Sequence, residues 1–251
     1  MTITIENSRK LHVKITKTTI VVGIILFAVG YLVSNVLPIS KSFSIDPGSG
    51  IITSTIGGDN LSKPKIQGSV NFEIPKFAKF QGSDSATLDL VEFGDYQCPF
   101  CEKFFQQTEP QVINEYVNPG KVKFYFLDFA IVGPDSLTLS EGAWCADEQG
   151  KYYDYHSYAY SHQGVENSGW GTVEKVKVFA SDLGLDTQKF NACLDSKKYE
   201  SRIQQLYQIG QGLGISGTPT MFIGNEKVGF TKITGTQPYE IFKQVMEPYL
   251  Q

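Results

Sequence analysis

The stretch VEFGDYQCPFCEKFF, residues 91–105, places Cys98 and Cys101 between an apolar run and an amphipathic run. The apolar run predicts a buried strand, and the amphipathic run predicts a helix that begins at the cysteines. Pro99 suits the first turn of such a helix, because the N–H group that proline lacks has no partner there. Fold and chemistry both depend on this order of strand, cysteine pair and helix.

The start of a helix favours the thiolate form of a cysteine. The first-turn amide N–H groups are unpaired and the helix dipole is positive there, so we expect a lowered pKa for Cys98. Three residues return nearly one helical turn, which brings Cys101 beneath Cys98. The spacing therefore predicts a redox-active disulfide with one attacking sulfur, Cys98, and one resolving sulfur, Cys101.

Two other interpretations of the pair stay open. A structural zinc site needs four ligands, and the chain has no second CxxC motif; His156 and His162 lie six residues apart in a tyrosine-rich segment. Two inert core thiols are the other alternative, although the start of a helix after a strand is a poor place to bury both. We expect no metal and no cofactor, and we expect His156 to be a partnered helix histidine without a catalytic role.

The N-terminal segment predicts a membrane anchor. No charged residue occurs between Lys17 and Lys41, and residues 18–39 are long enough for a helix that crosses a bilayer. Basic residues precede this run, which predicts a cytoplasmic N-terminus at 1–17 and an extracytoplasmic C-terminal domain. A cleaved signal peptide, with a break after residues 28–30, is the alternative. Both alternatives place the domain where disulfides persist.

The rest of the chain predicts a tether and one domain. Residues 40–68 are rich in Gly, Ser, Thr and Pro, which is typical of a flexible linker. Residues 69–251 read as an edge strand at 70–74, then strand, helix and strand, a helical block at about 135–213, two strands and a closing helix. This order predicts an α/β fold with a helical insertion. Pro110 should break the first helix near the residue before it.

Composition limits the classes of function. A chain of 251 residues that is 41% hydrophobic can form a full core without a disulfide scaffold, so each cysteine pair needs its own explanation. The formal charge is −4, and no long Lys/Arg cluster follows residue 40, which argues against nucleic acid as a partner. No dimerisation segment is evident, and we expect a monomer.

The second cysteine pair, Cys145 and Cys193, lies within the helical block among apolar neighbours. Outside the cytoplasm this pair predicts a structural disulfide, which would stabilise the fold by about 4 kcal/mol for a loop of this length. Two free buried cysteines are one alternative. A second redox-active pair is the other, although no polar or basic residue flanks either cysteine closely.

Four segments, VEFGDYQCPFCEKF, CADEQGKYYDYH, FNACLDS and GISGTPTMFIG, together resemble the DsbA-like thiol–disulfide oxidoreductases of the thioredoxin superfamily. The resemblance covers roughly residues 84–250. It implies a thioredoxin fold with a helical insertion, with Cys98 as the attacking and Cys101 as the resolving cysteine. It also implies an activity, the introduction of disulfides into exported cysteine-containing polypeptides, and a membrane thiol oxidase of the quinone-linked kind as redox partner.

The resemblance also assigns residues around the cysteines. Pro219 matches the cis-proline that faces the pair, and Thr218 precedes it; an ordinary proline at the start of a strand is the alternative. Glu92 matches a buried carboxylate that can shuttle the proton of Cys101, and an exposed acid at the end of a strand is the alternative. Asp95 is a weaker candidate for the same role.

Phe100 is a departure from the family pattern. Strongly oxidising relatives carry Pro-His between the cysteines, and this chain carries Pro-Phe, which cannot donate to the thiolate. We therefore expect a milder oxidant, and a disulfide reductase or isomerase is the alternative. A thiol-dependent chaperone or a metal-binding module is the alternative outside enzymes.

Overall fold

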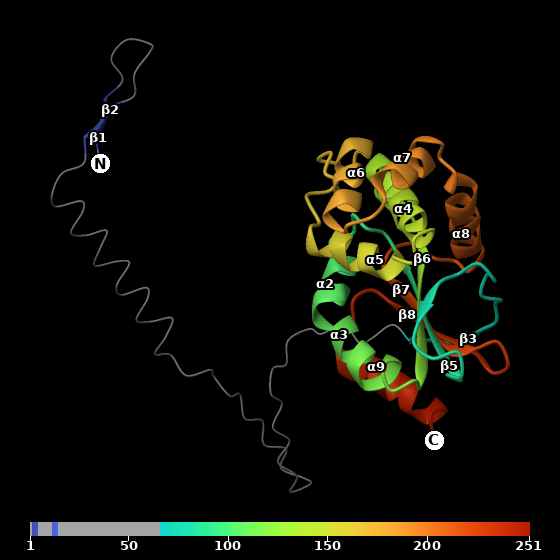
Figure 1. Ribbon diagram of the computed structural model, residues 1–251. Helices are drawn as coiled ribbons and strands as arrows, with labels where there is room; N and C mark the ends of the chain where they lie inside the picture. Colours follow the sequence, from blue (N-terminus) through green and yellow to red (C-terminus); the bar gives the residue numbers. More distant parts are fainter. Residues whose placement is uncertain (1, 5–11, 15–65) are drawn as a thin grey trace, which may run out of the picture. The chain divides into compact units, whose positions relative to one another are not determined.

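The computed structural model describes residues 2–4, 12–14 and 66–251 (Figure 1). Strands β1 (Thr2–Thr4) and β2 (His12–Lys14) pair antiparallel as a unit of their own. The expected anchor at 18–39 and most of the expected linker lie outside the described residues. In the described part of the chain, no helix has both the length and the apolar character that a bilayer crossing requires.

A mixed six-stranded sheet forms the centre of the second unit, in the order β3-β8-β7-β5-β6-β4. The central strand β5 pairs parallel with β6 and antiparallel with β7. The apolar run before the cysteines is therefore buried on both sides by neighbouring strands, as a continuous apolar run predicts. The strands are β3 (Ile66–Val70), β4 (Phe80–Gln81), β5 (Leu88–Gly94), β6 (Val122–Asp128), β7 (Thr220–Asn225) and β8 (Gly229–Thr234).

Helices pack around this sheet in two groups (Figure 1). The first group flanks the sheet: α2 (Pro99–Gln107), α3 (Glu109–Val112), the π-helical η1 (Ile113–Val117), α9 (Tyr239–Met246) and the 3₁₀ turn η2 (Glu247–Tyr249). The second group connects β6 to β7, where the sequence predicts a helical block: α4 (Pro134–Asp147), α5 (Tyr152–Ser161), α6 (Val173–Asp182), α7 (Thr187–Asp195) and α8 (Glu200–Gly212). The result is a thioredoxin-like α/β fold with a helical insertion.

Side chains alternate between the two faces of β5, because successive residues of a strand point in opposite directions. Leu88 and Leu90 belong to the cluster that α2, η1 and α9 cover. Val91 and Phe93 belong to the larger cluster that continues into the helical insertion. Glu92 follows Leu90 in this alternation, so it lies on the face that carries α2.

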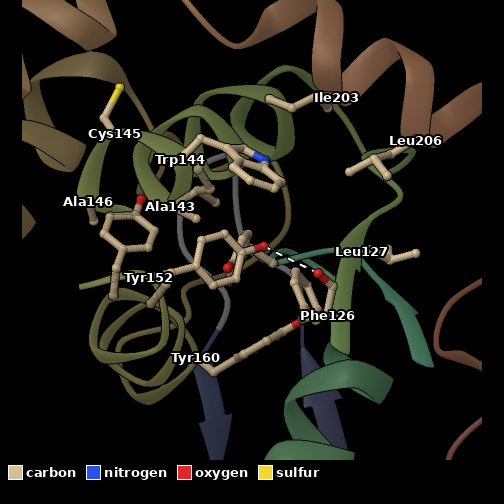
Figure 2. Packing of buried hydrophobic residues seen from close by; sticks show 14 of the residues in the cluster. Phe126, Leu127, Ala143, Trp144, Cys145, Ala146, Tyr152, Tyr160, Ile203 and Leu206 are labelled. Atoms are coloured by element: carbon tan, nitrogen blue, oxygen red, sulfur yellow. Dashed lines mark hydrogen bonds between the residues drawn. The ribbon is translucent and has the colours of Figure 1, made fainter. Parts of the chain in front are cut away.

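The helical insertion is fastened to the sheet by aromatic residues. Figure 2 shows Trp144, Tyr152 and Tyr160 gathered around Phe126 of β6. The Tyr152 hydroxyl donates to the Phe126 carbonyl at 3.3 Å, and Trp144 Nε1 donates to Asp128 Oδ2 at 2.8 Å. Buried hydroxyl and indole groups thus find partners at the carboxyl end of β6.

One local expectation, the helix break near Pro110, is confirmed, and another, the edge strand at 70–74, is wrong in its position. The helix after the cysteines is interrupted, as Pro110 predicts: α2 ends at Gln107 and α3 begins at Glu109. The edge strand expected at 70–74 is displaced, because β3 runs from Ile66 to Val70 and pairs with β8. Phe72 leaves the ladder and packs its ring 4.5 Å from that of Phe230, so aromatic burial ends the strand early.

Candidate active site

Cys98 occupies the N-cap position of α2, directly after the loop that follows β5. Its carbonyl oxygen accepts the N–H groups of Cys101 at 3.0 Å and Glu102 at 3.1 Å, which starts the helix. Both cysteines are free thiols in this structure. Cys98 keeps 5% of its surface exposed, whereas Cys101 has none. A partner can therefore reach only the first sulfur without a movement of the helix.

Thr218 and Pro219 lie opposite this pair. The Thr218–Pro219 peptide bond is cis, and β7 begins at the next residue. The Cys98 Sγ donates to the Thr218 carbonyl oxygen at 3.3 Å. The fold thus brings together two segments that lie 120 residues apart in the sequence.

The surroundings shift the pKa values of the two thiols in opposite directions. A hydrogen bond from the Cys101 side chain lowers the pKa of Cys98 from 9.0 to about 6, against the effect of burial, and the Thr218 side chain and the first-turn amides act in the same direction. Burial raises the pKa of Cys101 well above its ordinary value. The arrangement favours a thiolate at Cys98 next to a thiol at Cys101.

Glu92 is buried, with 1% of its surface exposed, and is not an exposed acid at the end of a strand. Neither carboxylate oxygen has a hydrogen-bond partner. A Cβ atom at Gly94 would lie 3.1 Å from Glu92 Oε1 and 2.3 Å from the Phe126 ring, so the glycine leaves room for this carboxyl. Burial raises the pKa of Glu92 well above 4.5, and the charges of Glu109 and Cys98 add to it.

Asp95 has a different task from the one considered for it. Its Oδ1 accepts the Gln97 N–H at 2.8 Å, and its Oδ2 accepts the N–H groups of Ile131 at 2.7 Å and Val132 at 2.9 Å. Both oxygens are therefore engaged in joining the loop before Cys98 to the loop after β6. The residue shapes the site, and its carboxylate is not free to shuttle a proton.

Sequence reasoning missed two residues of the site. Gln163 Nε2 donates to the carbonyl oxygens of Tyr96 at 2.6 Å and Cys98 at 3.2 Å, which ties the loop after α5 to the cysteines. No motif marks this glutamine, and a partly buried hydrogen bond between segments 65 residues apart leaves no local pattern. Glu109 is the other omission, since a glutamate next to a helix break looks like an ordinary surface residue.

His156 of α5 and His162, the residue directly after this helix, have different surroundings. His156 is fully buried and neither ring nitrogen makes a hydrogen bond; the partner expected for it is the Glu109 carboxylate, with Nε2 3.6 Å from Oε2. His162 is exposed and stacks on Tyr158 with ring centroids 4.0 Å apart. They do not converge on one point.

The second cysteine pair is far less polar. Cys145 of α4 and Cys193 of α7 are joined in a disulfide with a Cα–Cα distance of 5.8 Å. Both lie in the insertion, within the larger hydrophobic cluster. This bond closes the helical insertion on itself and uses no residue of the sheet.

Comparison with known proteins points in one direction. A family model described as thioredoxin matches residues 77–247. Disulfide bond formation protein D of Bacillus subtilis is 28% identical over 176 residues, which cover 68% of this chain and 76% of that protein. A probable disulfide bond formation protein D of Bacillus anthracis is 28% identical over 146 residues, which cover 57% of this chain and 67% of that protein.

A solved structure shows the same fold. Oxidised BdbD from Bacillus subtilis superposes with a TM-score of 0.62 at 23% identity, covering 68% of this chain and 91% of that chain. The superposed part spans nearly the whole of the solved chain.

Proposed function

Because the chain belongs to the thioredoxin family, as a DsbA-like protein-disulfide oxidoreductase, we propose that Cys98 and Cys101 are its redox-active pair and that it introduces disulfides into exported polypeptides. The observation that carries the proposal is that the pKa values of the two thiols shift in opposite directions, downward at Cys98 and upward at Cys101. One sulfur is prepared to attack and to leave as a thiolate, and the other stays a thiol until it resolves the intermediate.

The reaction starts from a disulfide between Cys98 and Cys101. A client thiolate attacks the Cys98 Sγ, the S–S bond breaks, and Cys101 takes the electron pair and a proton from the Glu92 carboxyl. A second client thiolate attacks the client sulfur of the mixed disulfide, and Cys98 leaves as a thiolate. The enzyme gains two electrons, and of the two client protons one reloads Glu92 and the other passes to solvent.

Client binding is proposed beside the cis peptide bond. The Thr218 carbonyl oxygen, 3.3 Å from the Cys98 Sγ, is placed to accept a hydrogen bond from an extended client segment. Phe100, in the first turn of α2, is 61% exposed, and Ile131, in the loop after β6, is 41% exposed. These side chains offer apolar contact to an unfolded client, which itself exposes apolar residues.

The cellular setting follows from the N-terminal sequence. Residues 18–39 would anchor the chain, with residues 1–17 in the cytoplasm, residues 40–68 as linker and the catalytic domain outside. A quinone-linked membrane thiol oxidase would then restore the Cys98–Cys101 disulfide. The name of the Bacillus subtilis relative, a disulfide bond formation protein, supports the oxidative direction.

A disulfide reductase or isomerase is the second candidate function, and Phe100 is the observation that favours it. Its ring offers no hydrogen-bond donor to the Cys98 thiolate, so the reduced state gains less stability than in a Pro-His relative. The redox state of the pair in cells decides the direction: a mostly oxidised pair supports the oxidase, and a mostly reduced pair supports the reductase.

Incubation of the oxidised protein with a reduced, unfolded two-cysteine polypeptide tests the proposal, with free thiols counted by mass after alkylation. Wild type should oxidise the client, Cys98→Ser should be inactive, and Cys101→Ser, preloaded with a disulfide at Cys98, should exchange once without closing. Circular dichroism checks that the variants are folded. Exchange that persists in Cys98→Ser would contradict the proposal. So would a wild type that binds the client without oxidising it, as a chaperone does, or a wild type whose client binding is lost when a chelator is added.

A further inference from the structure

Three ionisable side chains lie beneath the cysteine pair without hydrogen bonds to hold them. Glu92 is 1% exposed, Glu109 is 6% exposed and His156 is fully buried. Both oxygens of Glu92, Oε2 of Glu109 and both ring nitrogens of His156 lack a hydrogen-bond partner. Polar groups buried without partners destabilise a fold, because the lost hydration is not replaced. Stability therefore does not explain this cluster, and chemistry at the neighbouring cysteines is the alternative.

Six aromatic rings surround His156. Its Nε2 lies 3.6 Å from Glu109 Oε2, which suits an ion pair and is too long for a direct hydrogen bond. The titratable groups that face His156 include Glu109 and tyrosines from the loop after β5 and from α5 itself. The rings with centroids within 6.4 Å are those of Tyr96, Phe105, Phe124, Phe126, Tyr153 and Tyr160.

Glu92 connects the aromatic surroundings of His156 to the cysteines. It lies opposite Phe126 in the parallel register of β5 and β6, and the Phe126 ring is 4.6 Å from that of His156. Burial raises the pKa of Glu92 most, and the charge of Glu109 raises it further. Burial also raises the pKa of Cys101 most, with the Cys98 hydrogen bond and the charge of Glu92 adding to it.

A protonated Glu92 can give a proton to Cys101 but cannot accept one. The closing step needs an acceptor, because the Cys101 thiol must lose its proton before its sulfur attacks the mixed disulfide at Cys98. A neutral imidazole that takes the proton of Glu92 and becomes paired with a carboxylate would free Glu92 for this task.

We propose that His156 and Glu109 extend Glu92 into one proton relay between Cys101 and solvent, in which His156 is a positioning residue that holds the Glu92 proton. The inference rests on the proposed role of the cysteine pair. On closure, Cys101 gives its proton to the Glu92 carboxylate, its electron pair forms the bond to Cys98, and the client leaves as a thiolate. After closure the proton held on His156 passes to solvent through Glu109, the most exposed of the three, and on reduction one client proton returns to Glu92 by the same path.

Reaction of the reduced full-length protein with glutathione disulfide separates the two steps. Acid-quenched samples give the rate at which the mixed disulfide at Cys98 forms and the rate at which Cys101 closes it, from pH 5 to 9. The variants are His156→Phe, which keeps a ring, Glu109→Gln, which keeps the shape, and the double variant. His162→Phe is the matched control, since His162 directly follows the same helix but is exposed.

Each single variant should slow closure about tenfold at pH 7 and move its pH midpoint upward. The double variant should be no slower than the singles, and the first step and the control should be unchanged. Closure at the wild-type rate, slowing that multiplies in the double variant, or equal slowing of both steps would overturn the relay. Should His156→Phe fail to fold, Glu109→Gln decides by the same criteria. A wild type that never closes would contradict the proposed function instead.

Discussion

The two cysteine pairs of this protein are almost equally buried and differ in what surrounds them. Cys98 is 5% exposed and Cys193 is 6% exposed, so burial does not distinguish the reactive pair from the structural one. Cys98 starts a helix beside unpaired amides, the Thr218 carbonyl and a buried acid. Cys145 and Cys193 lie inside helices among apolar side chains. Polar groups within reach of the sulfur, and not access to solvent, set the chemistry of a cysteine here.

The largest expected effect comes from removal of the second pair, Cys145 and Cys193. In Cys145→Ala/Cys193→Ala the free energy of unfolding should fall by about 4 kcal/mol, because the unfolded chain loses a cross-link over 48 residues. Urea unfolding measures the loss. Thiol exchange by the folded fraction should stay at the wild-type rate. A variant that is folded and stable but inactive would show that the two pairs are coupled.

The pH dependence of alkylation tests the first pair. With a pKa of about 6, Cys98 should be roughly 90% thiolate at pH 7, against roughly 1% for a cysteine at 9.0. Iodoacetamide labelling of the reduced protein should therefore show a midpoint near pH 6. The free Cys145 thiol left by Cys193→Ala is the control; it is buried and should label only after unfolding. Labelling of Cys98 with a midpoint near pH 9 would erase the distinction between the pairs.

The same shift has a consequence for stability. The pKa of Cys98 is lower in the folded chain than in the unfolded chain, so its ionisation stabilises the reduced fold. This contribution is fully present at pH values above 9.0, the pKa in the unfolded chain. This contribution should shrink as the pH falls and vanish below about pH 6. Thermal unfolding of the reduced protein, compared with Cys98→Ser across this window, isolates it. An identical pH profile in the two proteins would contradict the lowered pKa.

Thr218→Val sharpens the comparison by removing one polar neighbour. The Thr218 side chain helps to lower the pKa of Cys98, and loss of a hydrogen bond to a charged group costs about 1.5 kcal/mol. The labelling midpoint of Cys98 should move upward, and labelling at pH 6 should slow several-fold. Thr231→Val, on β8, is a control of the same chemistry. No change in the midpoint would remove Thr218 from the account.

Phe100→His should have the smallest effect. A histidine can donate to the Cys98 thiolate, so the pKa of Cys98 should fall and the reduction potential should rise. The change should be modest because this position is 61% exposed and solvent screens the interaction. Equilibration with glutathione measures the potential. An unchanged value would mean that the residue between the cysteines does not set the strength of this oxidant.

The sequence was sufficient for the parts of the site that follow from local order. A strand, the Cys98–Cys101 motif and a helix start stand next to each other in the chain, and the helical block shows its own periodicity. Thr218 and Pro219 required a family resemblance, since nothing local relates them to residues 120 positions earlier. The edge strand was misplaced because Phe72 alternates like a strand residue but packs against Phe230.

Two members of the buried polar cluster, His156 and Glu109, could not be predicted from the sequence. His156 lies in a helix of tyrosines whose pattern resembles core packing, and Glu109 lies at a break in another helix. Only the assembled fold brings their side chains to 3.6 Å. The direction of the pKa shift of Glu92 is equally hidden in the sequence, because burial and not residue type raises this pKa.

The helical insertion leaves the sheet after β6 and returns to it at β7, and these two strands flank the same central strand. It carries its own disulfide, and it also brings Gln163 to the Cys98 carbonyl and His156 to Glu109. An insertion exchanged as a cassette between relatives would thus bring its covalent brace and its share of the reactive site with it. Recombination at the two strand ends offers evolution, and protein engineers, a way to retune the cysteine pair while the sheet that holds it stays unaltered.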